Sequence, residues 1–154
     1  MVTQEDIKAA RILIVDDEQS NVLLITKVLE RAGYTNVRGI TESARVLETY
    51  GEFQPDLILL DLHMPDVDGF EVLRQLSADL RYGARTPVMV ITGDEAVELK
   101  RRALVAGAKD FLTKPFDNFE VLARIWNLLE TRLLSLELYR QQREYEQRIA
   151  ELEK

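Results

Sequence analysis

The chain has 154 residues, of which 46% are hydrophobic, and carries a formal net charge of −7. This length and composition are sufficient for one globular domain with a hydrophobic core, and the lack of cysteine excludes disulfide bonds, thiolate metal ligands and thiol nucleophiles. No apolar run approaches the roughly 20 residues of a membrane span, and residues 1–10 lack the apolar core of a signal peptide, so we expect a cytoplasmic protein with no membrane partner.

The negative charge is concentrated in the first part of the chain. Residues 1–120 contain 21 acidic and 14 basic side chains, whereas residues 121–154 contain six of each. Nucleic-acid binding needs clustered lysine and arginine, so no nucleic-acid partner is expected for the main domain. An acidic excess is compatible with a cation site, although charge alone favours a solvated acidic surface.

Apolar, β-branched runs alternate with helical patterns between residues 11 and 129. After a polar lead-in over residues 1–10, which we expect to be frayed, strands are predicted at residues 11–15, 35–40, 57–60, 86–92 and 110–113. The intervening helices are predicted to begin at Ser20 or Asn21, at Thr41 or Ser43, and near residues 70, 95 and 118. The second is predicted to stop near Gly51 and Pro55, and the third to run through Leu80 and stop at Gly83. Five strand–helix units with short connections predict an α/β fold, a doubly wound parallel sheet with helices on both faces.

Polar residues stand where four of these strands end. Asp16 and Asp17 follow the first strand, Asp61 follows the third, Thr92 ends the fourth, and Lys114 follows the fifth. The carboxyl ends of parallel strands share one edge, and neighbouring strands are only about 5 Å apart, so these side chains are expected to converge. Three ionised carboxylates in one place require a cation, and a set of oxygen ligands without cysteine favours Mg²⁺ over Zn²⁺.

Such a set of side chains is suited to accepting a phosphoryl group. Asp61, on the central strand, is the best candidate nucleophile, while Asp16 and Asp17 are placed to hold the metal ion. Lys114 would neutralise charge on the phosphoryl oxygens, and the Thr92 hydroxyl would give them a hydrogen bond. Taken singly, each residue has a plainer interpretation as a helix cap, a strand terminus or a surface lysine. Their convergence favours a functional site.

Four sequence blocks carry a family resemblance. They are VDDE at residues 15–18, DLHMPDVDG at residues 61–69, ITG at residues 91–93 and KPF at residues 114–116. In order and spacing they resemble the signature blocks of the receiver domain of two-component response regulators, over about residues 11–129. The resemblance implies a flavodoxin-like sheet of strand order 2-1-3-4-5 and a signalling switch phosphorylated by a partner histidine kinase. Such a switch is not an enzyme in the ordinary sense, because it catalyses only its own phosphotransfer and dephosphorylation.

The resemblance also implies a role for each residue of the metal site. Asp61 would be the phosphoacceptor, and Asp17 would bind Mg²⁺ directly while Asp16 acts mainly through water. The backbone carbonyl of His63 would be a further ligand. The His63 side chain, the only histidine in the chain, is more simply placed at the rim of the site than in catalysis.

The remaining implied roles concern phosphoryl contacts and the conformational switch. Thr92 and Lys114 would each contact a phosphoryl oxygen, and Lys114-Pro115 would be a cis peptide. Phe111 occupies the family position of an aromatic switch residue, which is often tyrosine. Phe has no hydroxyl, so a switch that needs a tyrosine hydroxyl on the output surface is not expected here, and rearrangement by packing alone stays open.

Residues 117–154 contain neither proline nor glycine, which predicts one helix of about ten turns. A receiver needs only about the first three turns, so residues 130–154 form a helical extension. Within it Leu138, Gln142, Tyr145, Ile149 and Leu152 follow a 4-3-4-3 spacing. This amounts to about two heptads, fewer than the three to four of a firm coiled-coil pattern. We expect pairing with a second copy or with another element, a solvated helix being the alternative.

Residues 127–134 (NLLETRLL) resemble the linker that joins receivers to HD-GYP-type cyclic-dinucleotide phosphodiesterase domains. None of the residues of such an output domain can be placed in this chain. The resemblance therefore predicts a receiver and linker helix taken from a longer protein. The apolar stripe and balanced charge of the extension favour passing the signal on through the C-terminal helix by dimerisation.

Two other functions stay open at this point. One is an aspartyl-phosphate phosphatase of the haloacid dehalogenase type, which should carry an Asp-x-Asp pair on its first strand, whereas Asp16 and Asp17 are adjacent. The other is a dimeric scaffold that is not phosphorylated, against which the complete five-residue set argues.

Overall fold

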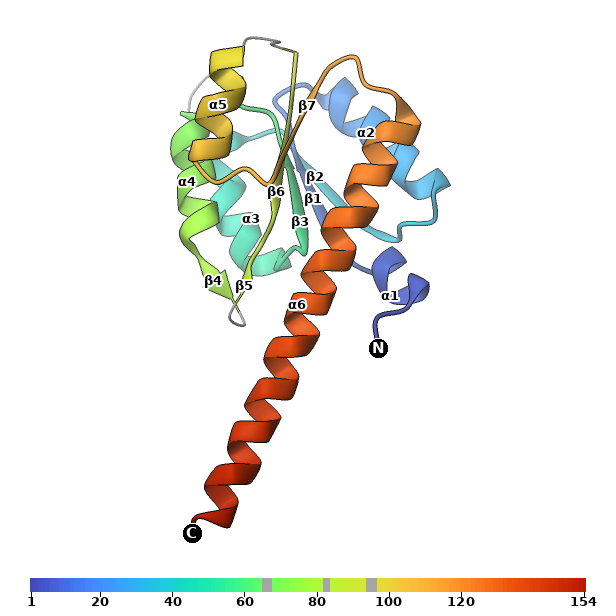
Figure 1. Ribbon diagram of the computed structural model, residues 1–154. Coiled ribbons are helices and arrows are strands. Elements are labelled where there is room, and N and C mark those ends of the chain that lie inside the picture. Colours follow the sequence, from blue (N-terminus) through green and yellow to red (C-terminus); the bar gives the residue numbers. More distant parts are fainter. Residues whose placement is uncertain (65–67, 82–83, 94–96) are drawn as a thin grey trace.

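The protein is described by a computed structural model, which covers residues 1–64, 68–81, 84–93 and 97–154 (Figure 1). Its centre is a parallel sheet of order β2-β1-β3-β6-β7. The strands are β1 (Arg11–Val15), β2 (Asn36–Ile40), β3 (Leu57–Leu60), β6 (Val88–Thr92) and β7 (Asp110–Thr113). Numbered along the chain, this is the predicted strand order 2-1-3-4-5, so the fold prediction is confirmed.

Helices cover both faces of the sheet (Figure 1). One face carries α2 (Gln19–Arg31) and the first turns of α6 (Asn118–Leu152), and the other carries α3 (Val46–Phe53), α4 (Gly69–Ala78) and α5 (Val97–Val105). Successive residues of a strand point to opposite faces, so β3 can serve both layers. Leu57 and Leu59 pack in the cluster with α2 and α6, whereas Ile58 and Leu60 pack in the cluster with α3, α4 and α5.

The expected frayed lead-in contains a short helix, α1 (Gln4–Lys8). Thr3 and Asp6 form a capping box, in which the Thr3 hydroxyl accepts from the Asp6 N–H and the Asp6 carboxylate accepts from the Thr3 N–H. Ile7 is only 2% exposed and belongs to the main core cluster. A single buried apolar residue gives no periodicity, which is why the sequence pattern missed this helix.

The segment after α4 also differs from the prediction. The third helix was expected to run to Leu80, but α4 ends at Ala78, and two-residue strands β4 (Leu80–Arg81) and β5 (Ala84–Arg85) form an antiparallel hairpin. Strands of two residues are too short to show a pattern in sequence. The predicted stop at Gly83 lies outside the described residues.

Several helix boundaries are shifted by local conformation. Helix α2 begins at Gln19, so Ser20 and Asn21 lie inside it and neither is its N-cap. A 3₁₀ turn, η1 (Ser43–Arg45), precedes α3. Helix α3 ends at Phe53, between Gly51 and Pro55, and its C-cap Gln54 adopts a left-handed conformation with φ of 50°.

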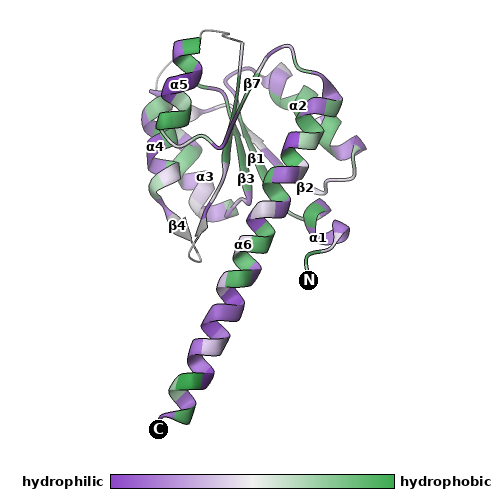
Figure 2. Ribbon diagram, viewed as in Figure 1, coloured by the Kyte–Doolittle hydropathy of each residue, from purple (hydrophilic) through white to green (hydrophobic). Residues whose placement is uncertain are grey.

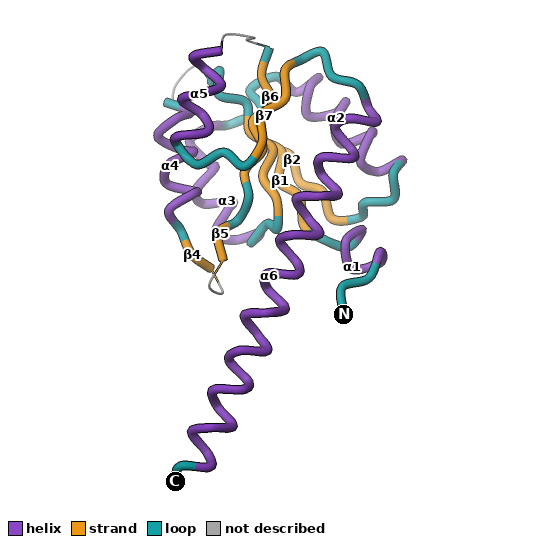
Figure 3. Tube along the Cα trace, viewed as in Figure 1, coloured by secondary structure: helices purple, strands orange, loops and turns teal. Residues whose placement is uncertain are grey.

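The predicted long C-terminal helix is confirmed. Asp117 caps α6 by accepting from the N–H groups of Phe119 and Glu120, and the helix then continues for 35 residues. Figure 3 shows its second half leaving the domain as a single helix, and Figure 2 shows mainly hydrophilic residues there with hydrophobic ones interspersed. Among the described residues, no helix is long and apolar enough to cross a membrane.

Candidate functional site

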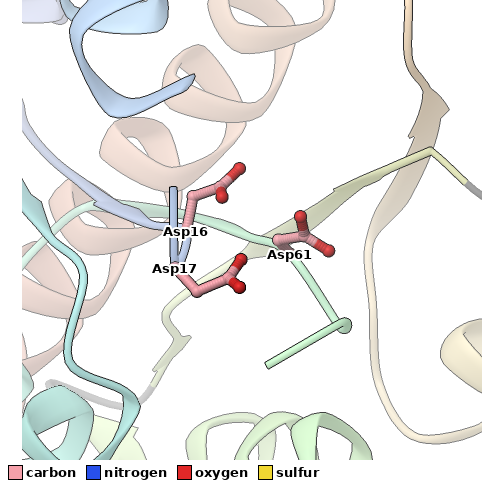
Figure 4. Close-up of side chains that lie close together, drawn as sticks. All are labelled: Asp16, Asp17 and Asp61. Carbon is pink, nitrogen blue, oxygen red and sulfur yellow. The ribbon is translucent and has the colours of Figure 1, made fainter. Parts of the chain in front are cut away.

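Three aspartates meet at the carboxyl edge of the sheet (Figure 4). Asp16 and Asp17 directly follow β1, and Asp61 directly follows β3. The backbone holds the two strand ends together, because the Asp61 N–H donates to the Val15 carbonyl at 2.9 Å. One carboxylate oxygen from each aspartate lies within 4.8 Å of the other two. Asp16 and Asp61 are buried, whereas Asp17 is exposed, so the cluster opens to solvent on one side.

Lys114 closes the cluster from the end of β7. Its ammonium donates to Asp16 Oδ2 at 2.7 Å and to Asp61 Oδ2 at 3.1 Å. Backbone hydrogen bonds hold the second carboxylate oxygen of Asp16 and of Asp61. The Glu18 N–H donates to Asp16 Oδ1, and the His63 N–H donates to Asp61 Oδ1. The Lys114-Pro115 peptide is cis, as the family resemblance predicts. The structure therefore brings four of the five expected side chains into direct proximity.

The charges of this cluster do not balance. Burial lowers the pKa of Lys114, but the hydrogen bond to Asp16 and the charge of Asp61 outweigh it, so the pKa lies above its ordinary value and the side chain is charged. Three carboxylates against one ammonium leave an excess of two negative charges among these four side chains. Close-set carboxylate oxygens with an open side match the ligand preference of Mg²⁺, so the residues present fit this ion.

The fifth expected residue, Thr92, ends β6 next to β7. Its side chain is fully buried, and its Oγ1 has no hydrogen-bond partner within the described part of the chain. The Lys114 N–H donates to the Thr92 carbonyl at 2.8 Å, which ties the two strand exits together. A buried hydroxyl without a partner is unfavourable, and this one belongs to the residue whose carbonyl accepts from the Lys114 N–H.

Phe111, the expected switch residue, is 8% exposed on β7. It lies opposite Val90 of β6 and packs in the cluster beneath α5 with Ala103. His63 is exposed, and the structure places its backbone N–H on Asp61. The predicted role of the His63 carbonyl stays a prediction. Residues 65–67 of the second sequence block lie outside the described residues.

Two features were not predicted from sequence. The Asn21 side-chain amide lies 3.4 Å from Asp16 Oδ1, because α2 begins early enough to turn Asn21 toward the acidic cluster. At the opposite edge of the sheet, Arg132 is buried with its Nε 3.9 Å from Asp56 Oδ1. The signal for Arg132 was its spacing, since it continues the buried series Val121, Ile125, Leu129 on α6.

Comparison with known proteins identifies relatives over most of the chain. Residues 12–126 match the response regulator receiver domain family. The DNA-binding dual master transcriptional regulator RpaA of Synechocystis sp. is 42% identical over 119 residues, covering 77% of this chain and 48% of the relative. Response regulator PleD of Caulobacter vibrioides is 39% identical over 130 residues, covering 84% of this chain and 28% of the relative. The chain thus spans about half, or less, of the length of these relatives.

Solved structures agree with the sequence matches. The signal receiver domain of a response regulator from Bermanella marisrubri has a TM-score of 0.69 and 34% identity, covering 79% of this chain and 98% of that one. A response regulator receiver domain protein from Methanospirillum hungatei has a TM-score of 0.73 and 28% identity, covering 82% of this chain and 98% of that one. The sequence match ends at residue 126, so it gives no support to the HD-GYP linker resemblance of residues 127–134.

Proposed function

This chain belongs to the response regulator receiver domain family, and from that premise we propose that it is a signalling switch whose phosphoacceptor is the Asp61 carboxylate. The observation that carries the proposal is the meeting of Asp16, Asp17, Asp61 and Lys114 at one sheet edge. As a receiver, the chain is a signalling phosphoacceptor and not a classical enzyme.

Phosphorylation would form a bond between an Asp61 carboxylate oxygen and phosphorus, while the bond from phosphorus to the donor histidine nitrogen of a sensor kinase breaks in line. Asp16, Asp17, Asp61 and the His63 carbonyl would hold Mg²⁺, which offsets charge on the phosphoryl oxygens. Lys114 already lies 3.1 Å from Asp61 Oδ2, so a small movement brings its ammonium to a phosphoryl oxygen.

Signal transmission would begin at Thr92. Its buried Oγ1 has no hydrogen-bond partner among the described residues, and a phosphoryl oxygen on Asp61 would supply an acceptor. Movement of Thr92 toward Asp61 would open space at the end of β6, into which the Phe111 ring would repack. This couples the site to α5 and α6 through packing, since Phe111 offers no hydroxyl.

We assign residues 11–129 to the receiver and residues 130–154 to an output helix that acts by homodimerisation. A sensor histidine kinase is the proposed donor, and a cytoplasmic location follows from that partner. RpaA and PleD are about twice or more the length matched here, which supports an additional output domain in the full-length protein. The proposal of an HD-GYP type for that domain rests only on residues 127–134.

The two competing functions are less well supported. A phosphatase of the haloacid dehalogenase type would place its nucleophile on the first strand, whereas Lys114 and the other carboxylates surround Asp61 on the third. A scaffold that is not phosphorylated would not need the unbalanced charge of the acidic cluster.

The test is incubation with acetyl phosphate and Mg²⁺, followed by intact-mass spectrometry of wild type, Asp61→Asn and Asp68→Asn. Asp68 is a control because its side chain caps α4 outside the cluster. We expect one added phosphoryl group in wild type and Asp68→Asn and none in Asp61→Asn. Equal incorporation in Asp61→Asn would contradict the proposal.

A further inference from the structure

Beyond the sheet, α6 has one face that is already covered by the chain itself. Val2 and Leu133 both pack against the core cluster that contains Leu129, and the Lys8 ammonium lies 5.4 Å from the centre of the Trp126 ring. A groove of about 950 Å³ runs between the N-terminal segment and this face, lined on the α6 side by residues that include Leu133, Leu136, Glu137 and Arg140. This face is directed toward residues 1–10.

The opposite face of α6 carries an exposed apolar stripe. Residues of an α-helix are separated by about 100° around its axis, which places the stripe roughly opposite the groove face. Its members and their exposed fractions are Leu134 (45%), Leu138 (67%), Tyr145 (66%), Ile149 (39%) and Leu152 (85%). The stripe is about 27 Å long, given 1.5 Å per residue. Five large apolar side chains aligned in water on one helix face indicate a contact surface.

We infer that this stripe pairs in parallel with the α6 stripe of a second copy of the chain. Leu138, Gln142, Tyr145, Ile149 and Leu152 have the 4-3-4-3 spacing of coiled-coil core positions. The inference deepens the proposed function, because it specifies the geometry of the homodimer, and it rests on that function only for the dimer's role in output.

The flanking residues are complementary in the parallel arrangement. With residues 135, 142 and 149 at the a positions of the heptad, the residue directly before each of them faces the residue five places later on the other helix. Arg148 then faces the partner's Glu153, an opposite-charge pair. Gln141 faces the partner's Glu146, and Leu134 faces the partner's Tyr139. All three pairs are favourable in kind, and no like charges meet.

Antiparallel arrangements use the same residues less well. If Gln142 packs against the partner's Tyr145, Leu152 falls opposite the partner's Ser135 and is left outside the apolar seam. A shift by one heptad brings Arg148 opposite the partner's Arg148 and Glu146 opposite the partner's Glu146. Like charges at these positions are repulsive. In the parallel dimer both receivers lie at the same end of a two-helix stem.

The chain contains no cysteine, so single cysteines report the geometry cleanly. Gln142→Cys places a thiol in the parallel seam, where identical residues of the two helices come within disulfide range. Gln147→Cys is the matched control, because residue 147 lies on the far side of the helix and is also exposed. After mild oxidation of the full chain we expect a covalent dimer for Gln142→Cys and little for Gln147→Cys.

Equal cross-linking of the two variants would overturn the inference. So would a mixture of Gln142→Cys and Tyr145→Cys chains that cross-links better than Gln142→Cys alone, since that outcome indicates antiparallel pairing. By sedimentation equilibrium, the double variant Tyr145→Glu, Ile149→Glu should weaken self-association at least about tenfold, because burying carboxylates in an apolar seam is unfavourable. Glu144→Gln, outside the seam, should leave it unchanged, and a monomeric wild type would also overturn the inference.

Phosphoryl incorporation in the same variants separates this inference from the proposed function. The second half of α6 extends away from the carboxyl edge of the sheet (Figure 1), so Gln142→Cys and the double variant Tyr145→Glu, Ile149→Glu should both still accept phosphoryl groups on Asp61. Cross-linking without phosphorylation would leave the dimer intact and remove the proposed function. Phosphorylation without cross-linking would leave the proposed function intact and remove the parallel dimer.

Discussion

The two ends of β3 each carry a buried aspartate, and we propose different roles for the two side chains. Asp56 precedes the strand, accepts the Arg11 N–H at 2.9 Å and lies 3.9 Å from Arg132 Nε. Asp61 follows the strand and lies 3.1 Å from the Lys114 ammonium. Burial and a nearby cation are therefore common to both positions, and neither property distinguishes the proposed phosphoacceptor from Asp56.

The difference lies in the balance of charge. In the ion pair that the described residues show, Asp56 faces the buried Arg132 guanidinium, one carboxylate and one cation. Asp61 shares a single ammonium with Asp16, and Asp17 adds a third carboxylate. In the described part of the chain this is the one group of three or more such ligands. Balanced charge suits a structural anchor between β3 and α6, whereas an excess of carboxylates suits a site that receives a cation.

The largest expected difference between the two ends of β3 is in the free energy of unfolding of the Asp56 and Asp61 variants. Asp56→Asn removes the charge facing buried Arg132, so we expect a loss of about 2 to 3 kcal/mol, toward the low end because the 3.9 Å separation is long. Asp61→Asn relieves repulsion among carboxylates and should leave stability unchanged or raise it. Urea unfolding followed by far-UV circular dichroism gives both values. Equal losses would show that the two aspartates are both anchors.

Magnesium should act at only one end of the strand. An ion that binds only the folded state adds about 2.7 kcal/mol of stability at a hundred times its dissociation constant. Wild type and Asp56→Asn should both show this gain in urea unfolding, whereas Asp61→Asn should show less of it. A similar gain in all three proteins would mean that Mg²⁺ binds elsewhere, and no gain in wild type would argue against the metal site.

The smallest effect concerns two buried threonines at the two ends of the fourth main strand. Thr86, before β6, and Thr92, at its end, both have buried hydroxyls without a hydrogen-bond partner in the described structure. Replacing either by valine should change stability by no more than about 1 kcal/mol, in the stabilising direction, because no hydrogen bond is lost.

The response to a phosphoryl mimic should distinguish Thr86 from Thr92, although their valine variants should have similar stability. Beryllofluoride with Mg²⁺ mimics the phosphoryl group, and we expect it to shift amide NMR signals of α5 and α6 in Thr86→Val as in wild type. In Thr92→Val those distant shifts should be reduced. If Thr92→Val responded like Thr86→Val, the proposed path through Thr92 would be wrong.

Much of the fold followed from sequence because the chain uses strong local signals. Uniformly apolar strands such as residues 57–60, and a long stretch free of proline and glycine, allow few alternatives. The convergence of Asp16, Asp61 and Lys114 also followed, because topology fixes which strand ends share an edge. The strands, the long helix and the converging site residues all depend on the order of elements along the chain.

The missed features depend on contacts between distant segments. Helix α1 is held by the burial of Ile7, and Asp56 meets Arg132 only after α6 has packed on the sheet. Asn21 lies near Asp16 because α2 begins one or two residues before the predicted position. Tertiary packing determines these helix boundaries and side-chain contacts, and a local sequence pattern does not predict it.

The central claim is that Asp61, and neither Asp16 nor Asp17, accepts the phosphoryl group. Its most direct test is to phosphorylate the wild-type chain with acetyl phosphate and Mg²⁺, trap the acyl phosphate with borohydride, and sequence the peptides by mass spectrometry. The reduction converts a phosphorylated aspartate into homoserine. We predict homoserine at position 61 alone. Homoserine at position 16, 17 or 56, or none at any position, would contradict the account.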